Sequence, residues 1–275
     1  MTTIPTFALN DGSSVPAIGF GTYPLRGREG TDATLSAIDA GYRLIDTAVN
    51  YRNEDAVGAA VRETDVPRDE LVVATKLPGR DHGFEETITS CRGSLASLGL
   101  DRIDLYLIHW PNPSVGRFVE SWKAMIQLQR EGLVRSIGVS NFTEEFLTRL
   151  ADETGVLPAV NQVELHPALQ QRDVQAANNA HGVVTEAWSP LAQGGALLSE
   201  EAITTIADRL GRTPAQVVLR WHLQQGRVVI PKSVTPSRIA ENIALFDFEL
   251  TGDDLAAIDG LERDGRVGSH PAEVN

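Results

Sequence analysis

The sequence predicts a single α/β domain over residues 1–275, folded as a (β/α)8 TIM barrel that is preceded by an N-terminal β-hairpin. Eight short, β-branched and nearly continuously apolar segments recur along the chain, as expected for parallel strands buried on both faces. Amphipathic segments with helical periodicity separate them. Regular alternation of strand and helix favours a closed barrel, and an open doubly wound sheet is the alternative.

Each element of this barrel has its own signal. The hairpin is expected around the Asn-Asp-Gly turn at residues 10–12. One helix begins at Phe84 and is stopped by Gly99, and another begins with a capping box formed by Thr213 and Gln216. The barrel strands are expected at residues 17–21, 43–48, 71–77, 104–110, 135–141, 159–165, 183–188 and 228–232.

Charge and composition argue against several classes of protein, including those that bind nucleic acid or span a membrane. The formal net charge is −13, from 24 Lys and Arg against 37 Asp and Glu, which argues against nucleic acid or an anionic membrane as partner. Cys91 is the single cysteine, so no intramolecular disulfide can form. The chain start lacks the features of a signal peptide, and no apolar run reaches the length of a membrane span. We therefore expect a cytoplasmic protein.

Polar or aromatic side chains stand at seven of the eight predicted strand ends. In a barrel of this kind the C-terminal ends of the strands form the active site. Burial of such groups carries a desolvation cost unless they are paired or used, so their shared position at one face indicates function. These residues are Asp46, Lys76, His109, Ser140 with Asn141, Gln162, Trp188 and Lys232.

Four residues near the first of these strand ends could make a tuned acid. Tyr51 follows Asp46 by five residues in the next loop. A tyrosine has an ordinary pKa of about 10, and a nearby ammonium such as Lys76 should lower that pKa. A carboxylate would hold the lysine charged, and His109 could orient a substrate oxygen. This set predicts a general acid that acts on a carbonyl group.

At this point the sequence resembles the aldo-keto reductase family, and within it the bacterial branch that includes the 2,5-diketo-D-gluconate reductases. The resemblance extends from about residue 17 to about residue 248, and the order and spacing of the motifs are more specific than any one of them. The motifs are DTAVNY…NE, ATK, LIHWP, IGVSNF, NQVELHP, WSPL and IPKSVTPSRIAEN.

The resemblance implies a reaction and a cofactor. Tyr51 would be the general acid, tuned by Lys76 and Asp46, with His109 positioning the carbonyl oxygen and NADPH supplying the hydride. Trp188 would stack on the nicotinamide ring. The residues implied in cofactor binding are Ser140, Asn141 and Gln162 at the carboxamide; Ser189, Leu191, Gln193 and Gly194 at the pyrophosphate; and Lys232, Ser233, Val234, Arg238, Glu241 and Asn242 at the adenosine.

A cationic turn in this acidic chain favours NADP(H) over NAD(H). Lys232 and Arg238 flank Thr235 and Pro236, which begin a helix whose first N–H groups are free. In the family this position holds the adenosine 2′-phosphate. A guanidinium can bind phosphate in a fork, which makes Arg238 the expected determinant.

The substrate pocket is less well defined by the sequence. Tyr23 stands where a tryptophan is frequent in the family, and the Leu-Pro-Gly at 77–79 stands where many members place an aromatic residue, so the carbonyl substrate stays open. The expected pocket residues are Tyr23, Val49, Asn50, Leu77, His109, Trp110 and His270.

Two other functions are compatible with such a barrel. Relatives of this family can serve as channel subunits, so a non-catalytic NADPH-binding regulatory protein or sensor is one alternative. A barrel glycosidase that pairs Asp46 with Glu164 or Glu186 is the other, although it has no use for the cationic turn. The histidines show no ligand spacing, so no metal is expected. The resemblance suggests a monomer.

Overall fold

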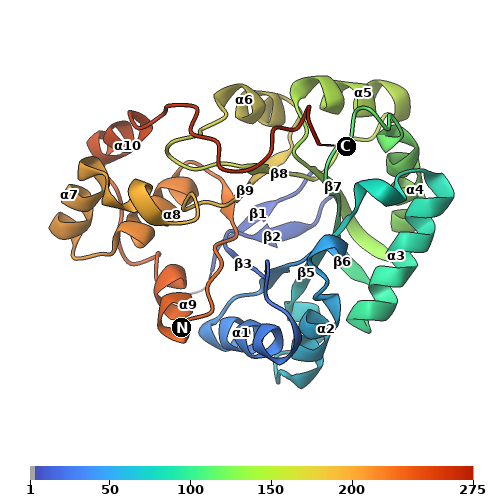
Figure 1. The fold of residues 1–275 in the computed structure, drawn as a ribbon, viewed down its shortest axis with the longest axis horizontal. Helices are drawn as coiled ribbons and strands as arrows, with labels where there is room; N and C mark the ends of the chain where they lie inside the picture. Colours follow the sequence, from blue (N-terminus) through green and yellow to red (C-terminus); the bar gives the residue numbers. More distant parts are fainter. Residues whose placement is uncertain (1–3, 275) are drawn as a thin grey trace.

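A computed structural model describes residues 4–274, and its centre is an eight-stranded parallel sheet closed into a barrel (Figure 1). A parallel bridge between Ile18 and Val229 joins the two outer strands, and Val229 N donates to Ala17 O at 3.1 Å. The barrel is therefore confirmed over the open sheet. Its strands are β3 (Gly19–Gly21), β4 (Leu44–Asp46), β5 (Val72–Leu77), β6 (Ile103–Ile108), β7 (Val134–Ser140), β8 (Val160–Glu164), β9 (Val184–Trp188) and β10 (Val228–Val229).

All eight predicted strands are present, but several are shorter than expected, and the last ends three residues early. The prediction ran to Lys232, whereas β10 ends at Val229. Pro231 has no N–H to donate to a sheet, so the ladder cannot continue through it. Its carbonyl still accepts a hydrogen bond from Gly21 N at 3.1 Å. Lys232 consequently lies beyond the strand, in the loop above it, and not at the strand end.

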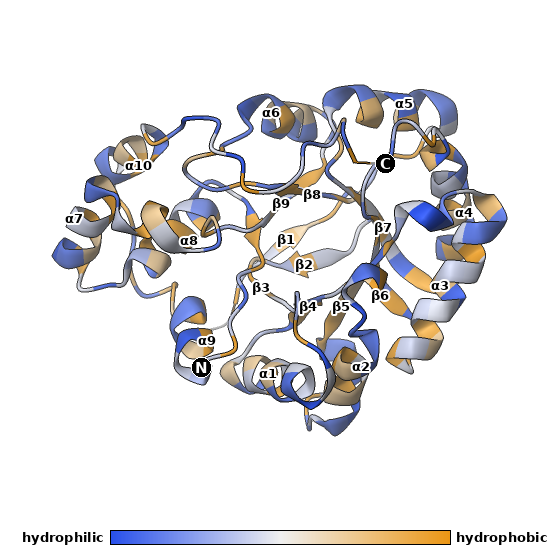
Figure 2. Cartoon of the chain, viewed as in Figure 1, coloured by the Kyte–Doolittle hydropathy of each residue, from blue (hydrophilic) through white to orange (hydrophobic). Residues whose placement is uncertain are grey.

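Helices surround the barrel and turn their apolar faces toward it (Figure 2). Gly99 ends α3 with a left-handed φ of 66°, and the capping box of Thr213 and Gln216 begins α8, both as predicted. The helices are α1 (Gly27–Ala40), α2 (Glu54–Glu63), α3 (Phe84–Leu98), α4 (Phe118–Arg130), α5 (Glu144–Thr154), α6 (Arg172–Ala180), α7 (Glu201–Leu210), α8 (Pro214–Gln224), α9 (Pro236–Ile243) and α10 (Gly252–Asp259), with short 3₁₀ helices η1 (Val49–Tyr51), η2 (Arg68–Glu70), η3 (Gly79–Asp81) and η4 (Gly195–Ser199).

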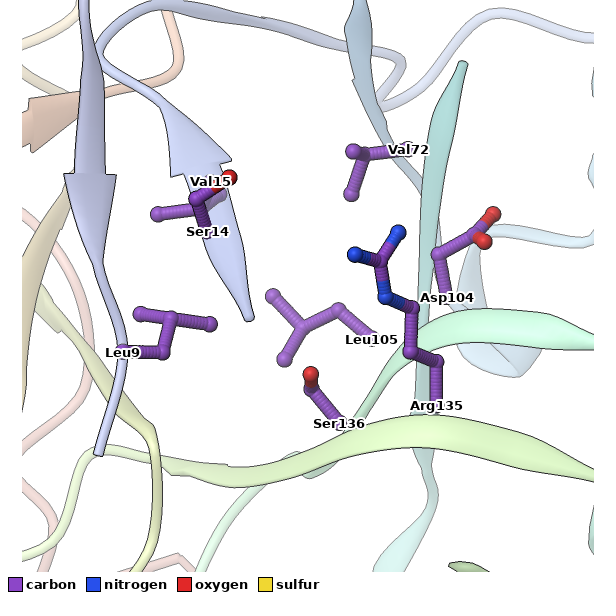
Figure 3. Close-up of a pocket in the computed structure, with 8 residues that line it drawn as sticks. All are labelled: Leu9, Ser14, Val15, Val72, Asp104, Leu105, Arg135 and Ser136. Carbon is purple, nitrogen blue, oxygen red and sulfur yellow. The ribbon is translucent and has the colours of Figure 1, made fainter. Parts of the chain in front are cut away.

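The predicted N-terminal hairpin forms from β1 (Thr6–Ala8) and β2 (Ser14–Pro16). It lies against the N-terminal ends of the barrel strands, where Ser13 Oγ is 2.9 Å from Ser136 Oγ. A small pocket between them is lined by Leu9, Ser14, Val15, Val72, Asp104, Leu105, Arg135 and Ser136 (Figure 3). The hairpin thus covers this end of the barrel and leaves the opposite end for the site.

None of the helices within residues 4–274 is both long enough and apolar enough to cross a membrane.

Candidate active site

A buried ion pair lies at the C-terminal ends of β4 and β5. Lys76 Nζ donates to both carboxylate oxygens of Asp46, at 2.6 and 2.7 Å, and to Thr47 O at 2.9 Å. It also lies 3.4 Å from the Tyr51 hydroxyl. The lysine has no exposed surface and the aspartate is 2% exposed. Such a pair is stable only when the charges compensate each other and the remaining bonds are made, as they are here.

The loop that carries Tyr51 is held by hydrogen bonds at both of its ends. Arg26 Nε donates to Tyr51 O at 3.0 Å. Asn53 directly precedes α2, but its side chain does not cap the helix. Asn53 instead accepts from Thr47 Oγ1 at 2.6 Å and donates to Thr22 O at 3.1 Å. These bonds anchor both ends of the loop to the strand ends, which holds Tyr51 over Lys76.

The expected shift in the pKa of Tyr51 was wrong in direction. Burial raises the pKa of the Tyr51 phenol, and the nearby Lys76 ammonium lowers it only in part, while Asp46 adds to the rise. Burial also disfavours the Lys76 ammonium, but attraction to Asp46 and Tyr51 outweighs it and raises the pKa of Lys76. Tyr51 is therefore a protonated phenol at neutral pH beside a permanent cation, which suits proton donation.

His109 follows β6 and meets Tyr51 edge to face, with ring centroids 5.7 Å apart. Burial, with repulsion from the Lys76 ammonium, lowers the pKa of His109 to about 3. Its backbone carbonyl accepts from Asn141 Nδ2 at 3.0 Å, and its ring Nδ1 has no hydrogen-bond partner in residues 4–274. A neutral imidazole can donate one ring N–H to a substrate oxygen.

The residues predicted to bind the nicotinamide form one hydrogen-bonded group. This group lies beside Asp46, Tyr51, Lys76 and His109. Asn141 adopts a left-handed φ of 64° and accepts from Trp188 Nε1 at 2.9 Å. Ser140 Oγ donates to Gln162 O at 2.8 Å. Gln162 Nε2 donates to Asp46 Oδ2 at 2.9 Å, which joins this group to the ion pair. The structure thus brings these predicted residues together.

The loop after β9 follows an irregular path. Positive φ values of 49°, 48°, 59° and 83° occur at Ser189, Ala192, Gln193 and Gly194. Leu191 is partly buried and packs against the apolar core, whereas Gln193 is exposed. Ala192 N donates to Ser189 O and Gly194 N donates to Leu191 O, both at 2.8 Å, and these bonds within the loop fix its path.

The cationic turn lies above β10, at the start of α9. Lys232 and Arg238 are exposed, and neither side chain makes an ion pair or hydrogen bond with any residue in 4–274. Thr235 precedes α9 but does not cap it with its side chain, and Pro236 occupies the first position. Ser233 Oγ instead accepts from Thr235 N at 3.1 Å. The free N–H groups and two unpaired cations fit a phosphate group.

The remaining residues expected at the adenosine lie beside this turn. Val234 is 46% exposed, a high value for an aliphatic side chain. Glu241 Oε1 accepts from Thr213 Oγ1 at 2.8 Å, so the carboxylate is partly engaged with α8. Asn242 is buried on α9. Val234 and Glu241 therefore have surface that a ligand could contact, whereas Asn242 has little.

With this geometry in place, comparison with known proteins decides the family. The family model described as Aldo/keto reductase family matches residues 17–263. The chain belongs to the aldo/keto reductase family. It is therefore an oxidoreductase, and the family predicted from its sequence motifs is confirmed.

Its curated relatives include reductases of small carbonyl compounds. The 2,5-diketo-D-gluconic acid reductase B of Corynebacterium sp. is 58% identical to this aldo/keto reductase, over 97% of this chain and 96% of its own. The methylglyoxal reductase DkgA of Escherichia coli is 50% identical, over 96% of this chain and 95% of its own.

Solved structures of similar proteins contain the cofactor. A point mutant of Gox0644 in complex with NADPH has a TM-score of 0.95 at 43% identity, with both chains covered in full. An aldo-keto reductase from Bombyx mori in complex with NADP has a TM-score of 0.91 at 34% identity, over 98% of this chain and 96% of its own.

In this aldo/keto reductase a row of aromatic rings runs along the site. Tyr23 is 61% exposed, and its ring centroid lies 5.0 Å from that of Tyr51. Trp110 lies between His109 and Trp188, with centroid distances of 6.5 and 6.4 Å. Tyr23 and Trp110 therefore lie next to the catalytic candidates Tyr51 and His109, and their role as pocket walls stays a prediction.

The other predicted pocket residues differ in exposure. Leu77 is completely buried in the apolar core and offers no surface to a substrate, so its predicted place in the pocket wall was wrong. Val49 is partly buried, and Asn50 is exposed and accepts from Arg80 Nη1 at 2.7 Å. His270 lies in the exposed C-terminal segment, beside a pocket lined by residues of that segment.

No motif in the sequence predicted how the C-terminal segment is attached. Glu164, at the end of β8, accepts from the backbone N–H groups of Val267 and Gly268 at 2.6 and 2.9 Å. His166 Nε2 lies 3.1 Å from the same carboxylate, so this histidine helps to hold Glu164 in place. A Cβ on Gly268 would come 2.3 Å from the Trp188 ring. The segment, dark red in Figure 1, therefore lies directly on Trp188.

Within residues 4–274, no three His, Cys, Asp or Glu side chains gather as they would around a metal ion.

Proposed function

We propose that this aldo/keto reductase uses NADPH to reduce the carbonyl group of a small aldehyde or ketone to an alcohol, with Tyr51 as proton donor. The observation that carries the proposal is the position of Lys76, 2.6 Å from Asp46 and 3.4 Å from the Tyr51 hydroxyl, at the open end of the barrel. The Lys76 ammonium beside the phenol would stabilise the tyrosinate that proton donation leaves. The solved relatives with NADPH or NADP support the cofactor.

Each of the four buried or half-buried polar residues would have one role in the reduction. The bound nicotinamide supplies a hydride to the carbonyl carbon. Tyr51 gives its proton to the carbonyl oxygen, and the Lys76 ammonium stabilises the tyrosinate that is left. Asp46 keeps Lys76 charged and aimed at the phenol. Neutral His109 donates a ring N–H to the same oxygen and holds the carbonyl near Tyr51.

The cofactor would be held at three places. The 2′-phosphate would bind Lys232, Arg238 and the N-terminus of α9, where the chain presents cations without partners. The nicotinamide would stack on Trp188. Its carboxamide would meet Asn141 and Gln162, and the free group of Gln162 there is Oε1, because Nε2 already donates to Asp46. Leu191, Gln193 and Gly194 would line the pyrophosphate.

A panel of carbonyl compounds followed by loss of NADPH absorbance tests the function. Methylglyoxal and 2,5-diketo-D-gluconate belong in the panel, because similar proteins carry those names. NADPH binding is measured in parallel by quenching of tryptophan fluorescence. Turnover of at least one carbonyl is expected. Tight NADPH binding without turnover of any compound would instead support the non-catalytic sensor.

We further propose that the protein is a monomer in the cytoplasm. Cys91 is buried, and burial raises the pKa of its thiol to about 12, so this thiol is not available at the surface to link two chains. Light scattering after gel filtration is expected to give one chain of 29.8 kDa, and a mass of two chains would overturn this assignment.

A further inference from the structure

Glu186 is a buried acid that the proposed reaction does not use. It lies on β9 with no exposed surface, in register with Gln162 of β8. Its Oε1 accepts from Gln162 Nε2 at 2.6 Å. Its Oε2 has no hydrogen-bond partner in residues 4–274. A buried carboxyl group with one bare oxygen requires an explanation, because buried polar atoms are normally paired.

Gln162 connects Glu186 to the catalytic group. The same Nε2 that donates to Glu186 also donates to Asp46 Oδ2 at 2.9 Å. One amide nitrogen therefore lies between two carboxyl groups from different strands, Asp46 of β4 and Glu186 of β9. Asp46 in turn binds Lys76, which lies 3.4 Å from the Tyr51 hydroxyl. The chain of contacts from Glu186 to the proton donor is continuous.

The charges around Glu186 do not balance if it is ionised. Among the described residues, the charged groups that act on it are Asp46 and Lys76, and the lysine is already paired with the aspartate. Its strand neighbours are Thr185 and Ala187, and Val228 of β10 lies opposite in register, so these positions bring no charge. One ammonium would then face two buried carboxylates, which is costly.

Glu164, the other buried acid nearby, has partners of its own that balance its charge. Glu164 is two residues along β8 from Gln162, but it accepts two backbone N–H groups and lies 3.7 Å from Arg266. Hydrogen bonds from His166 and the backbone outweigh its burial and lower the pKa of Glu164. For Glu186, burial and then the Asp46 charge raise the pKa to about 8, against the weaker opposing effects of Gln162 and Lys76.

We propose that Glu186 is a positioning residue that stays a neutral carboxylic acid at neutral pH, holds Gln162 against Asp46, and slows carbonyl reduction when it ionises in alkaline solution. Loss of its proton places a second negative charge in the barrel core. That charge disfavours the tyrosinate that Tyr51 must become, so the phenol is a weaker acid. The inference rests on the proposed function for its effect on rate, but not for the protonation of Glu186 itself.

Infrared spectroscopy of the ligand-free protein tests the protonation directly. A carboxylic acid C=O band is expected at pH 7, lost on titration through about pH 8 and missing from the Glu186→Gln variant. This measurement needs no substrate. If the band is absent from the wild-type protein at pH 7, the proposal is overturned, whether or not the protein reduces carbonyls.

The pH dependence of kcat/KM tests the effect on reduction. The wild-type rate is expected to fall by roughly threefold to tenfold on passing above the titration of Glu186. Glu186→Gln keeps the hydrogen-bonding shape and cannot ionise, so its rate should stay level over that range. Glu164→Gln is the matched control and should keep the alkaline fall, whatever its rate. An unchanged alkaline fall in Glu186→Gln would overturn the proposal.

Discussion

Lys76 and Lys232 are both cations at the open end of one barrel, yet their surroundings are opposite. Lys76 is fully buried and donates to Asp46 and Thr47. Lys232 is exposed and pairs with no residue in 4–274, and the same is true of Arg238. The difference separates two tasks. The groups that would act in the reaction are aligned before any ligand arrives, whereas the groups that would bind the cofactor phosphate keep their charge available.

Loss of the buried cation Lys76 is expected to have the largest effect on both stability and turnover. Lys76→Met keeps the length of the side chain but leaves the Asp46 carboxylate buried without its cation. Unfolding free energy is expected to fall by about 3–5 kcal/mol, and carbonyl reduction by about a thousandfold or more. Urea unfolding and NADPH turnover measure the two. Lys232→Met is the control, since replacing an exposed unpaired lysine should leave the urea midpoint unchanged. An equal loss of unfolding free energy in both variants would show that the two lysines do not differ in this way.

The second effect concerns the cationic turn. Arg238→Ala should raise the apparent KM for NADPH by roughly tenfold to a hundredfold, because a charge-assisted bond to phosphate is lost. The KM for NADH, which lacks the 2′-phosphate, should hardly change. Wild-type KM for NADPH should also rise with salt, because these cations are exposed. Steady-state kinetics with both cofactors are the measurement, and a similar rise for NADH would contradict the assignment of this turn.

A smaller effect is expected where the C-terminal segment lies on Trp188. Gly268→Ala would place a methyl group 2.3 Å from the Trp188 ring, so the segment must shift. We expect a several-fold weaker NADPH affinity with kcat nearly kept, together with a change in tryptophan emission. Gly252→Ala serves as control, because no atom lies within 4 Å of a Cβ there. If Gly268→Ala binds NADPH like wild type, the segment does not position Trp188.

The smallest effect concerns His109, whose protonation should not change kcat between pH 5 and 8. Burial, with the Lys76 charge, lowers the pKa of His109 to about 3, so it gains a proton only well below neutral pH. The kcat for reduction should therefore show no acid-side break near the ordinary histidine pKa of about 6.5. A profile from pH 5 to 8, compared between wild type and His109→Gln, measures this. A break near 6.5 that His109→Gln removes would show that the imidazole titrates there.

These expectations rest partly on what the sequence could predict. Strand and helix order, the hairpin at residues 10–12 and the capping box at Thr213 follow from local patterns, and all are present. The placement of Asp46 and Lys76 at one face also followed, because strand ends of a barrel share an edge. These are properties of spacing and of short segments.

What could not be predicted depends on contacts between distant residues. Gln162 bridges to Asp46 across 116 positions of sequence, and no local pattern records that bond. The pKa of Tyr51 was predicted in the wrong direction, because the cost of burial is a property of the packed barrel and exceeds the effect of Lys76. The attachment of Gly268 to Glu164 likewise joins segments 104 residues apart.

The central claim is that Tyr51, aligned by Lys76 and Asp46, donates the proton. Tyr51→Phe removes the hydroxyl that lies 3.4 Å from Lys76 Nζ and little else. With a carbonyl that the wild-type protein reduces, turnover should fall by about 10²–10⁴-fold while NADPH binding, followed by fluorescence, stays within about twofold. Turnover by Tyr51→Phe close to the wild-type rate would contradict the account, because the proton would then come from another group.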